Sequence, residues 1–185
     1  MNLIQHIATL FCLVCFATPL QAQEFSTDAP TDGVTIETSV LWPIFPGNLY
    51  LLRAAVPVGR GELLVGAQGR IPEQRPEEGK FNNLDVQLGW RQNLAYGLHI
   101  DGLLNLGWGH IEDSTIDGKD YDSFDGEVMA VAGWRIGLGP AHLLLQPVGF
   151  GYVFYKSNPW PIEGEGKPAQ EGPIYVGNVV AGWHF

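Results

Sequence analysis

Apolar and polar residues alternate with a period of two along most of the chain after Val34. Such alternation is typical of β-strands that have one apolar face and one polar face. Gly, Pro and Asn residues interrupt the pattern and divide it into eight segments. The predicted strands cover residues 34–42, 48–58, 61–71, 83–94, 97–111, 124–138, 141–155 and 173–185.

The connections between these segments alternate in length. Gly59-Arg60, Ala95-Tyr96 and Gly139-Pro140 are short enough for tight hairpins. The other connections are polar and mostly longer, and they cover residues 43–47, 72–82, 112–123 and 156–172. An even number of strands with short turns at one end and long loops at the other is typical of barrels in bacterial outer membranes. The pattern therefore predicts an up-and-down barrel.

A soluble lipocalin-like barrel also alternates, with its apolar face inside. The positions of the aromatic residues along the strands favour a membrane barrel instead, because Trp and Tyr concentrate at both membrane interfaces. If the last strand ends in the periplasm, the predicted aromatics form two girdles near the strand ends. These membrane-interface residues are Trp42, Tyr50, Trp90, Trp108, Trp134, Tyr175, Trp183 and Phe185.

The last strand alternates from Tyr175 through Trp183 to a terminal Phe185. This ending resembles the C-terminal signature of bacterial outer-membrane proteins, which the barrel-assembly machinery reads. The resemblance covers residues 34–185 and is to the small eight-stranded outer-membrane β-barrel proteins. It implies an all-β fold, an eight-stranded antiparallel transmembrane up-and-down β-barrel. It also implies the barrel-assembly machinery as a partner through Phe185.

The N-terminus has the pattern of a secretory signal. An apolar stretch from Leu3 to Phe16 is followed by Pro19 and by Ala22, where a signal peptidase would cut. We therefore expect residues 1–22 to be a signal peptide, 23–33 a periplasmic N-terminal segment and 34–185 the barrel domain, with export to the outer membrane.

Both cysteines lie inside this predicted signal peptide. Cys12 and Cys15 follow Phe11 and Val14, which are bulky where a lipoprotein site needs a small residue. We therefore expect no lipid anchor. The mature chain would contain no cysteine, which excludes disulfides and zinc-thiolate sites from it.

Composition narrows the function further. The chain has 20 acidic and 10 basic residues, a net charge of −10, and no cluster of Lys and Arg. Nucleic-acid binding needs such a cluster, so we exclude it. After residue 22 no apolar run approaches the roughly 18 residues of a membrane-spanning helix. Any membrane insertion must use strands.

Charged residues fall on the polar, inward face of the predicted barrel. An eight-stranded barrel leaves room only for side chains, and unpaired ions in so narrow a lumen are costly. We therefore expect an ion-pair network that plugs the lumen, with a narrow gated passage or a carrier for small molecules as the alternative. Its predicted members are Glu37, Arg53, Glu62, Arg70, Asp85, Arg91, Asp101, Asp125, Glu127 and Arg135.

Two sets of residues have the chemistry of a hydrolase. Ser39, His99 and Asp101 face inward, but strands one and five are opposite each other in the barrel, so a structural role is favoured. His110, Glu112 and Ser114 lie at the outer end of the fifth strand, where some small barrels modify lipid A. No His-x-Ser pair is present. A lipid A or phospholipid acyl-modifying enzyme is therefore the alternative, and a non-enzymatic envelope structural or loop-mediated interaction protein is favoured.

The loop from Glu112 to Ser123 is strongly acidic. Asp117, Asp120 and Asp122 offer oxygen ligands for calcium, but their spacing is not that of an EF-hand. A solvated acidic loop is the favoured interpretation, and we predict no cofactor. The expected partners are outer-membrane lipid and lipopolysaccharide.

Overall fold

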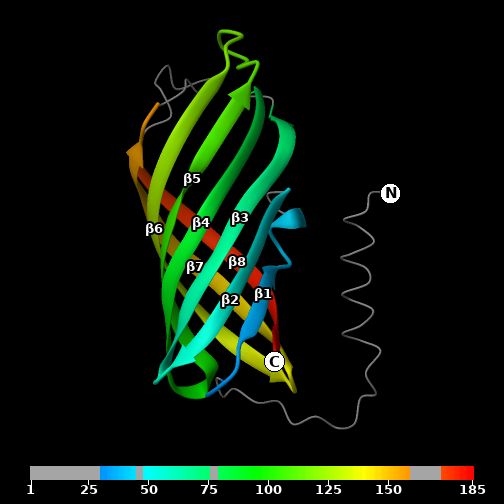
Figure 1. Ribbon diagram of the computed structural model, residues 1–185, viewed down its shortest axis with the longest axis vertical. Helices are drawn as coiled ribbons and strands as arrows, with labels where there is room; N and C mark the ends of the chain where they lie inside the picture. The colour runs from blue at the N-terminus through cyan, green and yellow to red at the C-terminus, as the bar shows by residue number, and fades with distance from the viewer. Residues whose placement is uncertain (1–29, 45–47, 76–78, 159–171) are drawn as a thin grey trace, which may run out of the picture.

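A computed structural model describes residues 30–44, 48–75, 79–158 and 172–185 (Figure 1). The predicted signal peptide and residues 23–29 lie outside this described part, as does most of the last predicted loop. No helix within these ranges is long and apolar enough to span a membrane.

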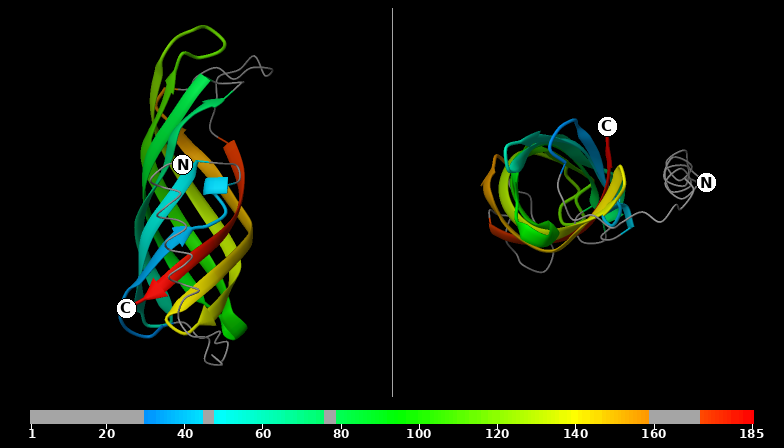
Figure 2. Two further views of the ribbon diagram at one scale, coloured as in Figure 1. Left: turned by 90° about the vertical axis from the view of Figure 1, so that its right-hand side faces the viewer. Right: turned by 90° about the horizontal axis from the view of Figure 1, so that it is seen from below.

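Eight strands follow one another around a closed barrel (Figures 1 and 2). Each strand is antiparallel to the next, and β8 closes the barrel against β1. The predicted eight-stranded antiparallel up-and-down barrel is therefore confirmed. The strands are β1 (Thr35–Ser39), β2 (Leu49–Val58), β3 (Gly61–Arg75), β4 (Gly79–Asn93), β5 (Leu98–Glu112), β6 (Tyr121–Leu138), β7 (Ala141–Lys156) and β8 (Gly172–His184), with a 3-10 turn, η2 (Ala95–Gly97), between β4 and β5.

The two ends of the barrel differ. The short connections β2–β3, β4–β5 and β6–β7 meet at one end, together with the C-terminus (Figure 1). We call this the turn end, and the opposite end the loop end. β3, β4 and β6 continue further toward the loop end than the alternation predicts. Pairing between β3 and β4 resumes beyond a register shift after Arg70, so much of the predicted 72–82 loop is strand.

The first strand is shorter than predicted. The backbone N–H groups of Val40 and Leu41 both donate to the carbonyl of Val179, at 2.8 and 3.4 Å. Two residues thus face one residue of β8, and regular pairing ends at Ser39. Beyond this point the chain turns inward and carries Trp42 into the barrel.

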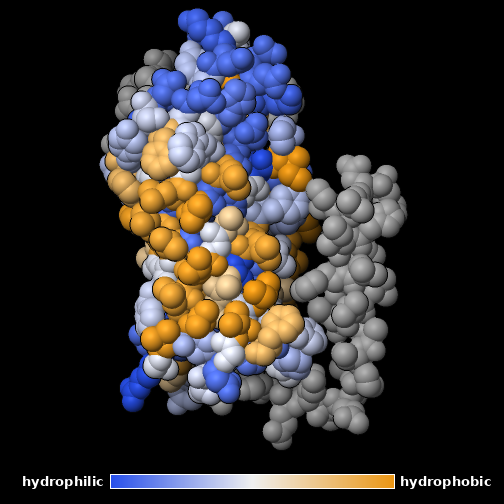
Figure 3. All heavy atoms as spheres, in the orientation of Figure 1, coloured by the Kyte–Doolittle hydropathy of each residue, from blue (hydrophilic) through white to orange (hydrophobic). Residues whose placement is uncertain are grey.

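The barrel has its apolar side chains outside and its ions inside. Leu52, Leu84 and Trp108 are each more than 60% exposed, whereas Glu37, Arg91 and Asp101 are fully buried. Apolar residues cover a broad band of the visible face, and hydrophilic residues gather at the loop end (Figure 3). This distribution is the reverse of that in a water-soluble protein, where large apolar patches are rarely exposed.

Candidate functional site

Six charged side chains fill the lumen near the turn end. We call this set the ion cluster, and it consists of Glu37, Arg53, Glu62, Arg91, Asp101 and Arg135. All six are at most 3% exposed. Three carboxylates face three guanidinium groups, so the cluster is electrically balanced without any other ion.

Arg91 lies at the centre of the ion cluster. Its Nε and Nη2 donate to Asp101 at 2.8 and 2.9 Å, and Nη1 and Nη2 donate to Glu37 at 2.7 and 3.2 Å. Arg53 also contacts both acids, with its Nε 2.6 Å from Glu37. Arg135 binds Glu62 at 2.5 Å. These two-pronged contacts fix the guanidinium planes as well as neutralising the charges.

Neutral polar groups complete this network. The Gln87 side chain accepts from Arg53 at 3.2 Å and donates to Asn105 at 3.0 Å. Gln146 donates to Asp101 at 2.9 Å, and the His142 ring lies 3.2 Å from Glu37. A search for charged residues alone does not identify these four neutral side chains. Their positions on the inward rows of the strands would have indicated them.

Glycine makes room for these large side chains. A Cβ at Gly182 would lie 2.4 Å from the His142 ring and 3.2 Å from Glu37. At Gly66 it would lie 2.3 Å from the Cβ of Arg53. The inward rows therefore pair a large residue on one strand with glycine on its neighbour, which packs a narrow lumen.

A layer of apolar side chains lies between the ion cluster and the loop end. Trp42, Leu51, Leu144 and Val180 form one buried apolar group there, and the Trp42 indole N–H donates to the Gly177 carbonyl at 2.8 Å. A neighbouring void measures about 10 Å³, which is at most the space of one water molecule. The prediction that Trp42 lies at the membrane interface is wrong: the residue is 9% exposed and lies inside. The early end of β1 is the reason.

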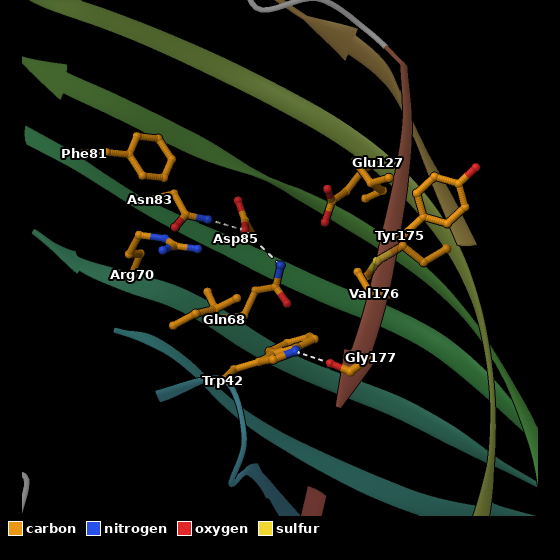
Figure 4. Close-up of a pocket in the computed structure, with 13 residues that line it drawn as sticks. Trp42, Gln68, Arg70, Phe81, Asn83, Asp85, Glu127, Tyr175, Val176 and Gly177 are labelled. Atoms are coloured by element: carbon orange, nitrogen blue, oxygen red, sulfur yellow. Dashed lines mark hydrogen bonds between the residues drawn. The ribbon is translucent and has the colours of Figure 1, made fainter. Parts of the chain in front are cut away.

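Beyond this layer, a cavity of about 450 Å³ opens at the loop end (Figure 4). We call it the loop-end cavity. Its walls come from β2, β3, β4, β6 and β8, and Trp42 forms part of the floor. The lining residues are Trp42, Leu49, Gln68, Arg70, Phe81, Asn83, Asp85, Glu127, Met129, Ile174, Tyr175, Val176 and Gly177.

The predicted network therefore divides into two parts. Arg70, Asp85 and Glu127 line the loop-end cavity and have no ion pair with the ion cluster among the described residues. Asp125 is paired with Lys156 at 2.8 Å close to the loop end. The two groups are linked through neutral amides and not through ion pairs: Arg53 donates to Gln87, Gln87 donates to Asn105, and Asn105 donates to Glu127.

The predicted catalytic residues have different partners. Nδ1 of His110 lies 2.8 Å from Asp122, and Glu112 pairs with Lys80 on the neighbouring strand. The Ser114 hydroxyl accepts a hydrogen bond from the Ile116 N–H at 3.4 Å, within its own loop. The structure thus provides a histidine–carboxylate pair at the loop end but does not bring Ser114 to it.

The inward-facing set is also separated. The Ser39 hydroxyl donates to Asn178 at 2.7 Å, and His99 lies 4.0 Å from Asp101 and 3.3 Å from Gln146. Ser39 therefore belongs to a hydrogen bond between β1 and β8. No nucleophile, base and orienting acid converge here in the way that acyl transfer requires.

The acidic loop holds its carboxylates apart. Asp117 accepts from the Tyr121 hydroxyl at 2.7 Å, and Asp120 accepts from the Asp113 N–H at 3.0 Å. The Tyr121 hydrogen bond, aided by Lys119, lowers the pKa of Asp117. No group of three or more metal-binding side chains occurs in the part of the chain that the structure describes.

The remaining aromatic residues differ in position. Trp90, Trp108, Trp134, Tyr175 and Phe185 are exposed on the barrel, whereas Tyr50 and Trp183 are partly buried. Trp108 packs edge-on against Phe124, with ring centroids 4.7 Å apart, and Phe150 packs against Tyr175 at 5.5 Å. Both pairs stand on the outer surface and bridge neighbouring strands.

Comparison with known proteins gives one similar structure. No protein family and no curated protein matches the sequence. The crystal structure of Neisserial surface protein A (NspA) superposes with a TM-score of 0.49 and 10% sequence identity. The alignment covers 82% of this chain and 96% of that one.

Proposed function

We propose that the protein is an integral outer-membrane β-barrel, exported by residues 1–22 and inserted with its loop end toward the cell exterior. The observation that carries this proposal is the reversed distribution of side chains. An apolar outer surface requires lipid, whereas a lipocalin-like barrel would place those residues inside.

The orientation follows from the two ends of the barrel. In bacterial outer-membrane barrels the short turns face the periplasm and the longer loops face outward. The C-terminal Phe185 lies at the turn end, as a strand read by the barrel-assembly machinery in the periplasm requires. This orientation directs the acidic loop and the loop-end cavity toward lipopolysaccharide and the medium.

The barrel serves, in this proposal, as a non-enzymatic structural or loop-mediated interaction protein of the envelope. The ion cluster and the layer around Trp42 support a closed lumen, which argues against a permanent pore. Lipopolysaccharide is the expected neighbour of the loops.

Cell fractionation tests the membrane assignment. The mature protein should remain with outer membranes after carbonate extraction, and its mobility on a gel should change on heating. Recovery as a soluble periplasmic monomer without detergent would overturn the proposal.

A lipid-modifying enzyme is the second candidate. The contact of 2.8 Å between His110 and Asp122 favours it, because a base held by an acid is part of such a site. Mass spectrometry of lipid A and phospholipids should compare cells that carry the wild type, the His110→Ala variant or no protein. We expect identical acyl compositions. Acyl loss or gain that depends on His110 would make the enzyme the better account.

A further inference from the structure

The loop-end cavity presents hydrogen-bond acceptors that have no donor among the described residues. Oδ2 of Asp85 accepts from Nε2 of Gln68 at 3.1 Å and from Nδ2 of Asn83 at 2.7 Å. An ionised carboxylate cannot donate, so both amide groups must turn their nitrogens toward it. Their carbonyl oxygens therefore face elsewhere.

Gln68 provides an acceptor without a donor. The residue is 6% exposed and lines the cavity, and its Oε1 has no hydrogen-bond partner in the described part of the chain. In Figure 4 its amide nitrogen points to Asp85, and its oxygen lies on the other side of the amide group. A buried acceptor without a partner costs free energy, and a ligand that donates a hydrogen bond would recover it.

The charges of the cavity wall are also unbalanced. Asp85 and Glu127 are acidic, and Arg70 is the basic residue among the lining side chains. The Arg70 guanidinium lies over the ring of Phe81, 5.8 Å from its centroid. Asp85 accepts from the neutral amides described above, and Glu127 accepts from the neutral amide of Asn105. The wall thus has an excess of one negative charge.

A glycine on β5 brings the two carboxylates to one side of the cavity. Gly107 is paired with Asp85, and Glu127 is paired with Asn105, two residues away on the same strand. A Cβ on Gly107 would lie 2.3 Å from Oδ1 of Asp85. The Asp85 carboxylate therefore occupies the space over β5, in the direction of β6 and Glu127.

The rest of the lining is apolar and aromatic. Trp42 and Phe81 contribute rings, and Ile174 and Val176 contribute aliphatic surface. Aromatic faces attract cations, and apolar walls bind the body of an amphipathic ligand. This combination of acceptors, negative charge and rings selects one class of ligand.

We propose that the loop-end cavity binds a small organic cation with an ammonium group on an apolar or aromatic body. The ammonium group donates hydrogen bonds to Asp85, Gln68 and Glu127, and the body of the ligand packs against Trp42 and Phe81. A volume of about 450 Å³ accommodates such a molecule. The barrel itself forms the cavity, so this proposal does not depend on the cellular location.

Calorimetry on the purified barrel in non-ionic detergent tests this proposal. The probe is 2-phenylethylamine, and 2-phenylethanol has the same ring and nearly the same size without the charge. We expect saturable binding of one amine per barrel and binding of the alcohol weaker by about tenfold or more, because charged hydrogen bonds are lost. Equal affinities, or no saturable binding of the amine, would overturn the proposal.

Variants then locate the site. Asp85→Asn and Glu127→Gln should each weaken amine binding by about tenfold, since each removes one charge from the cavity wall. Asp122→Asn is the matched control, because it removes the same charge from a side chain that is 80% exposed and outside the cavity. Each variant must keep its heat-dependent gel shift as evidence of folding. An unchanged affinity in both cavity variants, or an equal loss in the control, would overturn the proposal.

Discussion

Arg91→Met removes the guanidinium group at the centre of the ion cluster and keeps an unbranched apolar side chain in place of the Arg stem. Arg91 makes paired contacts with both Glu37 and Asp101, and its side chain is fully buried. Its loss changes the cluster from three acids and three bases to three acids and two bases. One buried carboxylate is then left without a compensating cation.

The expected loss of stability is about 3–5 kcal/mol, the range for a buried ion pair from which one partner is removed. Arg53 moderates the effect, because it still contacts Glu37 at 2.6 Å and Asp101 at 3.4 Å. The measurement is unfolding in denaturant of barrels reconstituted in lipid vesicles, followed by tryptophan fluorescence and by gel mobility.

Two further variants make this experiment decisive. Arg91→Met combined with Asp101→Asn restores two acids and two bases, so the double variant should be more stable than Arg91→Met alone. Lys80→Met is the control: it breaks the exposed Lys80–Glu112 pair and should have little effect. If Arg91→Met unfolds like the control, or if Asp101→Asn gives no recovery, the ion cluster does not stabilise the barrel as argued.

Three other outcomes are expected. Gly182→Ala should impair folding, because the new Cβ would lie 2.4 Å from the His142 ring. Gly102→Ala is the control and should fold normally, because a Cβ there would have no neighbour closer than 4.0 Å. Refolding yields measured on gels compare the two variants, and equal yields would contradict the packing argument. Planar-bilayer recordings of the wild type should show no steady conductance, and large stable channels would refute a closed lumen. The hydrogen bond from Tyr121 should keep the pKa of the Asp117 carboxyl below the ordinary pKa of an aspartate. The contact therefore stabilises the loop fully at any pH above the ordinary aspartate pKa. This stabilisation is lost as the pH falls through the lowered pKa of Asp117. Tyr121→Phe should raise that pKa in an NMR titration, and an unchanged value would show that the hydrogen bond does not form.

The sequence determined the architecture because β-structure repeats every two residues. In β4, Asp85 and Gln87 face inward while Leu84 and Val86 face outward, as the alternation predicts. The Gly59-Arg60 and Gly139-Pro140 connections confirm the predicted hairpins between β2 and β3 and between β6 and β7. Short-range pattern is sufficient here, since strand pairing between sequence neighbours leaves few other topologies.

Strand ends followed the sequence less closely. Residues 40–42 continue the apolar alternation, yet pairing stops at Ser39 because two N–H groups share the Val179 carbonyl. A bulge of this kind depends on the register of β8, which is more than a hundred residues away in sequence. The inward turn of Trp42 follows from this bulge, so the alternation of residues near Trp42 could not predict it.

Tertiary structure alone decided which inward charges meet. Alternation places Glu37, Asp85 and Arg91 on the inward rows of their strands. It does not give the position of each side chain along the barrel axis, nor the distances between side chains across the lumen. In the closed barrel the stagger of the strands brings Glu37 and Arg91 to 2.7 Å and leaves Asp85 on the far side of the layer around Trp42, with amide partners. Ion pairing and cavities depend on contacts across the lumen, and the shear of the barrel fixes these contacts only once all eight strands have closed.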